Sequence, residues 1–512
     1  MSGRCYYLAD STPAEQVKYH YNSIVYSGIS NHTGVNHTSL FDMALGLRSS
    51  RQTNKVSFIN KPNNIKGLYL HNTNPTPCDV LVIGGGPAGA TAATLLAERG
   101  HHVILLEKAR HPRFHIGESL LPANLPLLEK LGVAEAVKAI GMEKWGAEFN
   151  SPWHDHQQTY EFADAWDKSM PMAYQVRRSE FDEILIRNAS AKNVSVTEGC
   201  QVQEVIFLPD AQGALVHARH DDGRLESWCP RFVLDASGRD TFLGNQLKAK
   251  QRNKKHNSTA IYAHFSSAQR NLGKKEGHIS LFWFDHGWFW FIPLADGMTS
   301  VGAVTWPYYL KTRGKKSLDV FFHETIALCP QLAQRLAPAQ LESAVEATGN
   351  FSYVCDHTHG DNYLLLGDAY TFIDPVFSSG VMLAMQNAFI GADAVDTCLR
   401  HPDQTATALK KFDRSMRVGP KAFSWFIYRL TNPTMRDMFM APRNVFRAKE
   451  ALLSLLAGDI FSQTPIWTSI ALFKTMYYIG AVSRLKRTIH AWHLRKRNIR
   501  PVVETSAAHG DK

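Results

Sequence analysis

The sequence predicts an α/β fold that combines a Rossmann-like nucleotide-binding domain, an interleaved β-sheet domain and a helical C-terminal region. Three observations predict this organisation. Residues 78–108 show the pattern of a strand, a glycine-rich turn, a helix and a second strand. Residues from about 250 to 310 are aromatic and strand-like, and the hydrophobic spacing beyond about 400 is helical to near the end of the chain.

The chain divides into three predicted parts. Residues 1–76 are rich in Asn, Ser, His and Thr with weak periodicity, which indicates a poorly ordered or accessory extension. Residues 77–400 form the nucleotide-binding domain, and the interleaved sheet occupies about 250–345 within it. Residues 401–512 form the helical region, which ends in a basic tail. A length of 512 residues is compatible with two or three domains.

Charge and cysteine usage exclude several classes of function. The net charge is +10, but no acidic residue occurs from 460 to 503, and 484–500 contains seven Lys or Arg. The excess is therefore a C-terminal feature, and no nucleic-acid-binding motif accompanies it, so we expect no nucleic-acid partner. Seven scattered cysteines without a CxxC pair predict neither a metal site nor a disulfide framework. No secretory signal or run of about 18 apolar residues occurs, so a cytoplasmic protein is expected.

A glycine fingerprint follows the first predicted strand at residues 79–83. Gly84, Gly86 and Gly89 form GxGxxG, which provides a tight turn, close approach of backbone to a pyrophosphate and close helix–strand packing. The helix beginning near Pro87 points its N-terminus at the phosphates. Glu107 ends the next strand, where a carboxylate can accept hydrogen bonds from ribose hydroxyls. The order of these elements predicts a dinucleotide site.

Residues 287–293, Gly-Trp-Phe-Trp-Phe-Ile-Pro, alternate with a period of two. This period predicts a strand with Trp288 and Trp290 on one face and Phe289 and Phe291 on the other. Taken alone, the stretch is typical of a strand buried on both faces.

Three later segments resemble motifs of the flavoprotein hydroxylases. Residues 364–368 (Leu-Leu-Leu-Gly-Asp) resemble their second FAD motif, which implies that Gly367 and Asp368 approach the ribityl chain. Residues 233–239 resemble their strand-end motif near the flavin, which implies a cofactor contact for Asp235. Residues 174–182 are similar to their V-x-R-x-x-F-D segment, with Arg178 near the cofactor. The order of the three segments implies FAD on a hydroxylase-type scaffold.

Three further motifs resemble those of the flavin-dependent halogenases, over roughly residues 78–459. Trp288-x-Trp290-x-Ile-Pro is similar to their W-x-W-x-I-P motif, and residues 372–380, with Pro375 and Ser378, to their F-x-x-P-x-x-S-x-G motif. Residues 112–122 resemble their early P-R-F-x-I-G-E-S segment. The similarity is greatest to the branch that acts on phenols, pyrroles and related electron-rich rings, which includes the chloramphenicol-type enzyme.

This resemblance implies chlorination or bromination of an aromatic such as a phenol, resorcinol or pyrrole in secondary metabolism. In the family, FADH2 and O2 give a flavin hydroperoxide, and a halide ion attacks it to yield hypohalous acid. The acid passes through a tunnel to a lysine beside the substrate. A separate NAD(P)H-dependent flavin reductase supplies reduced flavin, and the aromatic substrate is free or bound to a carrier protein.

The resemblance also implies roles for individual residues. Lys144, in a K-x-G-A-x-F segment, matches the catalytic lysine, and burial beside an apolar tunnel should lower its pKa. The nearest alternative is Lys138, in a helix-like surface stretch. Ser379 and Gly380 match positions whose backbone N–H groups bind the halide. The implied catalytic set, including the residues around the reaction space, is Lys144, Ser378, Trp288 and Trp290.

One departure concerns the substrate. Tryptophan halogenases carry a glutamate just before the motif serine, where this chain has Phe377, so tryptophan itself is not the expected substrate. Nearby Asp374 belongs to a stretch that faces the flavin in the family, and it is not assigned as a general base.

Two other functions are open at this point. One is a FAD-dependent monooxygenase on the same fold. The other is a membrane-peripheral flavoprotein scaffold, because the basic tail could contact an anionic membrane surface from the cytoplasmic side. A helix packed on the FAD domain with a solvated basic face explains the tail equally well.

Overall fold

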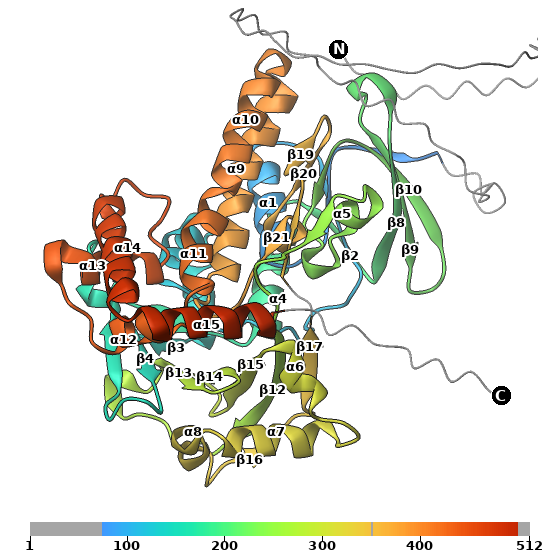
Figure 1. Ribbon diagram of the computed structural model, residues 1–512. Helices are drawn as coiled ribbons and strands as arrows, with labels where there is room; N and C mark the ends of the chain where they lie inside the picture. Colours follow the sequence, from blue (N-terminus) through green and yellow to red (C-terminus); the bar gives the residue numbers. More distant parts are fainter. Residues whose placement is uncertain (1–73, 350–351, 500–512) are drawn as a thin grey trace, which may run out of the picture. The chain divides into compact units, whose positions relative to one another are not determined.

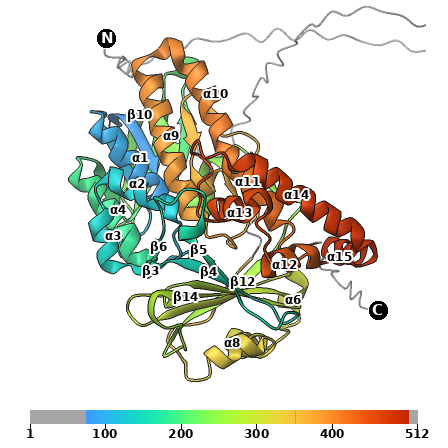
Figure 2. The ribbon, with the colours of Figure 1, turned by 90° about the vertical axis from the view of Figure 1, so that its left-hand side faces the viewer.

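The computed structural model describes residues 74–349 and 352–499, which belong to one compact unit (Figure 1 and Figure 2). The extension expected over residues 1–76 lies almost wholly outside the described residues, as does the end of the basic tail. Five of the cysteines, at 78, 200, 329, 355 and 398, are buried free thiols. No cluster of His, Cys, Asp and Glu in the described ranges could hold a metal ion.

The first large sheet carries the glycine-rich turn. Its strand β1 (Thr76–Ile83) lies between two parallel neighbours, β10 (Leu225–Asp235) and β2 (Val103–Glu107). β1 begins before the expected residue 79, because the pairing with β10 extends back to Thr76. The remaining strands are β7 (Ser195–Glu198) beside β2, β20 (Tyr363–Leu365) and β19 (His359–Gly360) on the side of β10, and the antiparallel pair β8 (Cys200–Phe207) and β9 (Ala214–His220).

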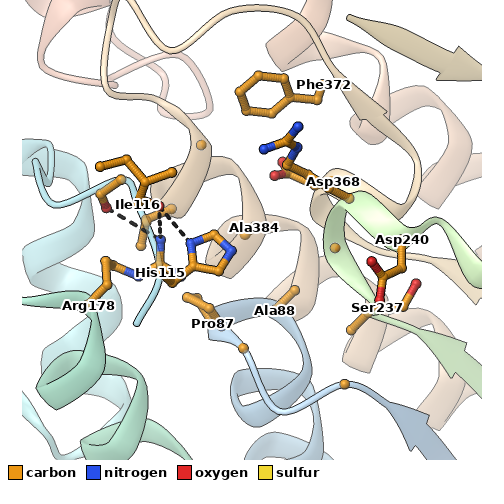
Figure 3. Close-up of a pocket in the computed structure, with 18 of the residues that line it drawn as sticks. Pro87, Ala88, His115, Ile116, Arg178, Ser237, Asp240, Asp368, Phe372 and Ala384 are labelled. Atoms are coloured by element: carbon orange, nitrogen blue, oxygen red, sulfur yellow. Dashed lines mark hydrogen bonds between the residues drawn. The ribbon is translucent and has the colours of Figure 1, made fainter. Parts of the chain in front are cut away.

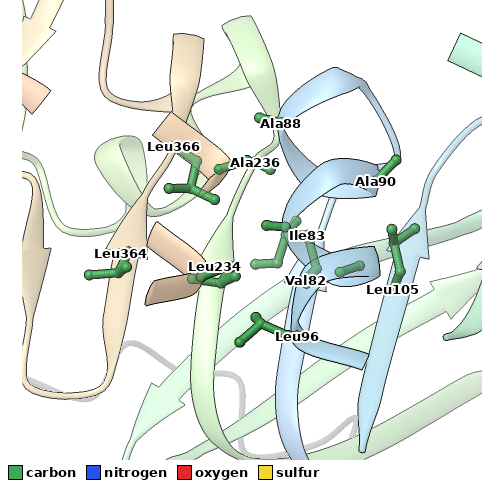
Figure 4. Close-up of a cluster of buried hydrophobic side chains, with 14 of the residues drawn as sticks. Val82, Ile83, Ala88, Ala90, Leu96, Leu105, Leu234, Ala236, Leu364 and Leu366 are labelled. Atoms are coloured by element: carbon green, nitrogen blue, oxygen red, sulfur yellow. The ribbon is translucent and has the colours of Figure 1, made fainter. Parts of the chain in front are cut away.

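Helices pack on this sheet through a continuous apolar core. α1 (Pro87–Glu98) packs against α4 (Arg178–Ala191) and α9 (Gly380–Arg400), and α9 packs against α10 (Thr405–Met416). The branched side chains of the central strands are buried where they face α1 (Figure 4). Removing such surface from water stabilises the sheet–helix contact by about 25 cal/mol per Å² of apolar area. The short helices here are α2 (Leu125–Leu131), α3 (Ala134–Ile140) and α5 (Phe242–Gln246).

The second large sheet lies below the first in both ribbon views (Figure 1 and Figure 2). Its strand order is β16 (Gln340–Leu341), β12 (Thr259–Ser266), β15 (Thr299–Thr305), β14 (Gly287–Pro293), β13 (Ile279–Phe284), β4 (Gly146–Asn150) and β5 (Gln158–Glu161), and β17 (Glu346–Gly349) also pairs with β12. Most strands come from the region expected at about 250–345. β4 and β5 come from much earlier in the chain. They belong to this sheet because β4 pairs in parallel with β13.

The two faces of β14 belong to different cores, as its alternation predicts. Trp288 and Trp290 pack into a cluster shared with the C-terminal helices. Phe289 and Phe291 pack into a second cluster under α6 (Pro307–Lys311), α7 (Leu318–Ala327) and α8 (Pro330–Arg335). The strand is therefore buried along its whole length.

The C-terminal region is helical, as expected. Its helices are α11 (Val418–Ile427), α12 (Pro433–Met440), α13 (Ala448–Leu456), α14 (Ile466–Ser483) and α15 (Leu485–Asn498). None of the helices in the described part of the chain is long and apolar enough to cross a membrane. The minor strands are β3 (Met142–Lys144), which pairs with β6 (Ala173–Gln175), and the group β11 (Lys250–Arg252), β18 (Tyr353–Cys355) and β21 (Thr371–Phe372).

Candidate active site

A cavity of about 700 Å³ is lined both by the carboxyl ends of β1 and β2 with the loop that follows β10, and by β14 of the second sheet. The N-termini of α1 and α9 also reach it, and so do residues 113–119, which lie between β2 and α2. Figure 3 shows side chains from α1, α4, α9, the 113–119 segment and the loop after β10 converging around one space. The crevice at the carboxyl ends of parallel strands is where open α/β sheets bind their ligands.

The glycine turn shapes one wall of the cavity. Gly84 has φ +102°, and a Cβ there would come within 2.5 Å of the Ala236 carbonyl oxygen. Gly84 and Gly86 line the cavity, whereas Gly89 does not. A Cβ on Gly89 would lie 1.9 Å from the Gly84 carbonyl oxygen, so this glycine allows α1 to pack closely on the turn.

Replacing Gly89 with alanine is expected to destabilise the fold by about 3 kcal/mol and to weaken FAD binding at least tenfold. The added methyl group must push α1 away from the turn that it supports. Thermal unfolding and flavin fluorescence titration measure the two effects. The control is Ala97→Gly in the same helix, which should lower stability by about 1 kcal/mol and leave flavin affinity unchanged. Equal flavin affinity in both variants would contradict this role of Gly89.

Glu107 lies at the cavity where β2 ends, as its position in the sequence predicts. Its carboxylate accepts hydrogen bonds from the backbone N–H of Gly85 at 2.6 Å and of Ala109 at 2.9 Å. These two donors hold the acid between the glycine turn and the residues that follow β2. The carboxylate is thereby fixed at the rim where a ribose can bind.

Positive charge gathers beside Glu107, because Arg113 Nε lies 3.8 Å from Glu107 Oε1. Arg178 donates to both oxygens of buried Asp182, at 2.8 and 3.0 Å, and this arginine holds the pKa of Asp182 below its usual value. Arg113 also reaches Asp182 and lines the cavity. The charge of Arg178, together with burial, lowers the pKa of His115 to about 4, so His115 is neutral at pH 7. The sequence motifs predict Arg178 at the cofactor but assign no role to Arg113 or His115, although both lie in the P-R-F-x-I-G-E-S segment.

Of the two aspartates predicted to bind the cofactor, only one lines the cavity. Asp368 lines the cavity, and burial raises its pKa to about 6. Asp235 does not line the cavity, because its carboxylate accepts from the backbone N–H groups of Ser237 and Leu243 at 3.0 and 2.7 Å. Asp235 instead fixes the loop 236–240, and that loop does line the cavity. Gly367 is also outside the lining; with φ +55° it forms the turn that presents Asp368.

The segment that leads into α9 forms another wall. Pro375, Ser378 and Gly380 line the cavity, and Ser379 is the buried residue that precedes the helix. Ser378 has φ +53°, a conformation that non-glycine residues rarely adopt outside turns and functional sites. The 21-residue helix α9 begins at Gly380, so its positive end lies at this wall. Free N–H groups and a helix dipole together favour an anion here.

The two tryptophans serve both the core and the cavity. The rings of Trp288 and Trp290 lie 6.2 Å apart and both line the cavity, although each is more than nine-tenths buried. The indole N–H of Trp290 donates to Ser300 Oγ at 3.1 Å, which fixes the plane of the ring. β14 is therefore both a strand of the buried core and, through Trp288 and Trp290, part of the cavity wall.

Lys144, at the end of β3, has an exposed fraction of only 1%. Its Nζ donates to Ser119 Oγ and to the Leu120 carbonyl oxygen, both at 2.9 Å. Burial lowers the pKa of the Lys144 ammonium to about 7. Lys144 itself does not line the cavity, but Ser119 does, so one hydroxyl separates the amine from that space. Lys138, the alternative, lies on α3 with a side chain that is 59% exposed.

The residues of the cavity fit FAD, and comparison with known proteins agrees. Residues 77–401 match the model of the FAD binding domain family. Among solved structures, the myxobacterial chondrochloren halogenase CndH, a FAD-dependent halogenase, is 31% identical with a TM-score of 0.66, over 79% of this chain and 98% of that one. This chain is a flavin-dependent halogenase by family.

Two curated relatives are halogenases with different substrates. Tryptophan 2-halogenase of Chondromyces crocatus is 35% identical over 66% of this chain, a stretch that spans 65% of that relative's length. The 1H-pyrrole-2-carbonyl-[peptidyl-carrier protein] chlorinase of Pseudomonas fluorescens is 29% identical over 75% of this chain and 90% of its own length. The relatives therefore include halogenases of an indole and of a carrier-bound pyrrole.

The departures from the halogenase motifs can also be placed. Phe377 is buried and packs against Phe423 and Phe426 of α11, so the position that carries a glutamate in tryptophan halogenases is apolar here. Asp374 does not line the cavity. It accepts hydrogen bonds from His256 at 2.7 Å and Ser258 at 3.1 Å, both buried. These two hydrogen bonds give the Asp374 carboxylate a structural role, and we assign it no role as a general base.

Proposed function

We propose that this halogenase uses reduced FAD, O2 and a halide ion to chlorinate or brominate an electron-rich aromatic ring, such as a phenol, resorcinol or pyrrole. The bound cofactor and O2 supply the oxidant that converts halide to hypohalous acid. A separate NAD(P)H-dependent reductase would provide the reduced flavin. The ring would be free or tethered to a carrier protein, as in the pyrrole chlorinase relative.

The observation that carries the proposal is the buried amine of Lys144. A solvated lysine is almost wholly protonated at pH 7, whereas burial lowers the pKa of this amine to about 7, so both its neutral and its protonated forms are available near that pH. A neutral amine can accept electrophilic halogen, and the protonated form can donate a hydrogen bond to hypohalous acid. Ser119 Oγ and the Leu120 carbonyl fix the position of Nζ for either role.

Other residues of this chain would hold and separate the reactants. Gly84, Gly86, Glu107, Arg178 and Asp368 would bind the cofactor. The backbone N–H groups of Ser379 and Gly380 would hold the halide at the positive end of α9. Ser378 would set the shape of that loop through its left-handed conformation. Trp288 and Trp290 would stand between cofactor and ring, which prevents direct oxygenation of the substrate.

The apolar surroundings of Phe377 favour a ring that reacts without help from a carboxylate. A phenol or pyrrole donates electrons from its own heteroatom, so it needs less assistance than an unactivated ring position. This supports phenols, resorcinols and pyrroles over tryptophan, although a tryptophan 2-halogenase is among the relatives.

The test is a coupled assay that contains the protein, FAD, an unrelated flavin reductase, NADH, oxygen and bromide. The substrates are simple phenols, resorcinols, pyrroles and tryptophan, each free and, for the pyrrole acid, loaded on a carrier protein. We expect the bromine isotope doublet on a phenolic or pyrrolic product in the mass spectrum, and none without the reductase. A hydroxylated product without bromine, or NADH oxidation by the protein alone, would favour the monooxygenase and contradict the proposal.

A further inference from the structure

The last two helices expose an unusual number of large apolar side chains. Val482 of α14 is 70% exposed, and Leu485, Ile489 and Trp492 of α15 are 54%, 45% and 55% exposed. Ile479, one turn before Val482, is 65% exposed. We call these five residues the C-terminal apolar stripe. Large exposed apolar side chains that recur along consecutive helices mark an interaction surface more often than a solvated one.

The stripe has a fixed direction relative to the body of the protein. Leu485, Ile489 and Trp492 follow the i, i+4, i+7 spacing of one helix face. Arg495 and Asn498 lie on another face, which packs onto the protein: Arg495 donates to the Lys255 carbonyl at 3.0 Å, and Asn498 is buried. Because α15 is anchored through that face, it cannot turn the stripe inward.

Unpaired positive charge flanks the stripe. Arg484 and Arg487 form ion pairs with Asp437 of α12. Lys486, Lys496 and Arg497, by contrast, have no carboxylate partner among the described residues, and all three are exposed. Lys496 Nζ lies 5.1 Å from the ring centroid of Trp492, so charge and apolar surface adjoin. No acidic residue from 460 to 503 opposes them.

We propose that the C-terminal apolar stripe docks on the surface of an anionic phospholipid bilayer, with α15 lying in the plane of the interface. Amphipathic helices of this kind insert apolar side chains, with Trp among the commonest, to the level of the headgroups. Lys and Arg at the edge contact the lipid phosphates. Tryptophan at such a boundary keeps its apolar ring buried and its N–H hydrated.

Charge argues for lipid over a second copy of this chain. Pairing two stripes across a two-fold axis would bring the same basic residues against one another, and like charges in a dry interface are unfavourable. An anionic bilayer offers the opposite charge around an apolar interior. The surface therefore matches the bilayer in apolar character and in charge. This match does not depend on which ring the active site modifies.

The experiment is flotation of the full-length protein with vesicles of phosphatidylcholine and phosphatidylglycerol at a 4:1 ratio, and with pure phosphatidylcholine. We expect flotation with the anionic vesicles only, and its loss at high salt. The double variant Ile489→Glu/Trp492→Glu and the triple variant Lys486→Glu/Lys496→Glu/Arg497→Glu should each lower the partition coefficient at least tenfold. Bound flavin, measured in parallel, should be unchanged.

Matched controls change exposed residues elsewhere. Leu272→Glu/Val320→Glu replaces two exposed apolar residues, which are 91% and 50% exposed, and Lys410→Glu/Lys411→Glu reverses two exposed charges on α10. Both controls should float like the wild type. Absence of wild-type flotation at about 0.1 M salt, or equal flotation of stripe and control variants, would overturn the proposal. A dimer in light scattering that Trp492→Glu dissociates would also overturn it, in favour of a second copy.

Discussion

Lys144→Met is expected to lower the halogenation rate roughly a thousandfold or more while leaving FAD bound. Methionine fills a similar volume in the buried site but has no amine to hold electrophilic halogen. FAD affinity should stay within about twofold, because Lys144 contacts Ser119 and Leu120 and does not line the cofactor cavity. The bromine isotope assay and flavin titration measure the two quantities.

The matched control is Lys138→Met, which removes an exposed lysine six residues away. It should retain wild-type halogenation. If Lys144→Met halogenates as fast as Lys138→Met, then another group delivers the halogen and the assignment of Lys144 is wrong. Loss of both FAD and activity in Lys144→Met would instead show that the lysine holds the cavity together.

The same residue should make stability depend on pH. Burial lowers the Lys144 pKa from 10.5 to about 7 in the folded state, while the unfolded chain keeps the higher value. Between these two values the unfolded chain binds more protons, so the free energy of unfolding rises as pH rises. Below about pH 7 the Lys144 amine is protonated in both the folded and the unfolded state. The buried ammonium then lowers the free energy of unfolding by its full amount.

Denaturant unfolding of the wild type and Lys144→Met at pH 7 and pH 10 measures this effect. The free energy of unfolding of the wild type should gain about 3 kcal/mol relative to the variant over that range. Other titrating groups are common to both proteins and cancel in the difference. A difference that does not change with pH would mean that the amine keeps an ordinary pKa and is hydrated in the fold.

The sequence predicts the elements whose signal is local. The alternation of residues 287–293 predicts strand β14 and assigns its tryptophans and phenylalanines to the correct faces. It does so because side chains in a strand point to opposite sides with a period of two. The GxGxxG spacing identifies a turn in which added side chains at Gly84 and Gly89 would collide with backbone. The motif around Lys144 selects the lysine that the fold buries over one that it leaves on the surface.

What the sequence does not predict depends on pairing between distant segments. β4 joins the second sheet through a parallel contact with β13, more than 120 residues later, and no local pattern encodes that choice of partner. Asp235 lies in a motif associated with the flavin, yet two backbone donors turn its carboxylate away from the cavity. The roles of Arg113 and His115 follow from the position of Arg178 and Asp182 on α4, which becomes known only once the chain is folded.

His256 links α15 to the loop before α9, and this link has a consequence for biosynthesis. Arg495 donates to His256 Nδ1 at 3.2 Å, and Nε2 of the same ring contacts Asp374 at 2.7 Å. A residue of α15, which comes much later in the chain, therefore supports the segment that ends in Ser378, Ser379 and Gly380. During translation the FAD-binding elements leave the ribosome long before Arg495 does. The nascent chain can thus acquire its nucleotide-binding half first, while the loop before α9 receives the support of Arg495 only after α15 has been synthesised.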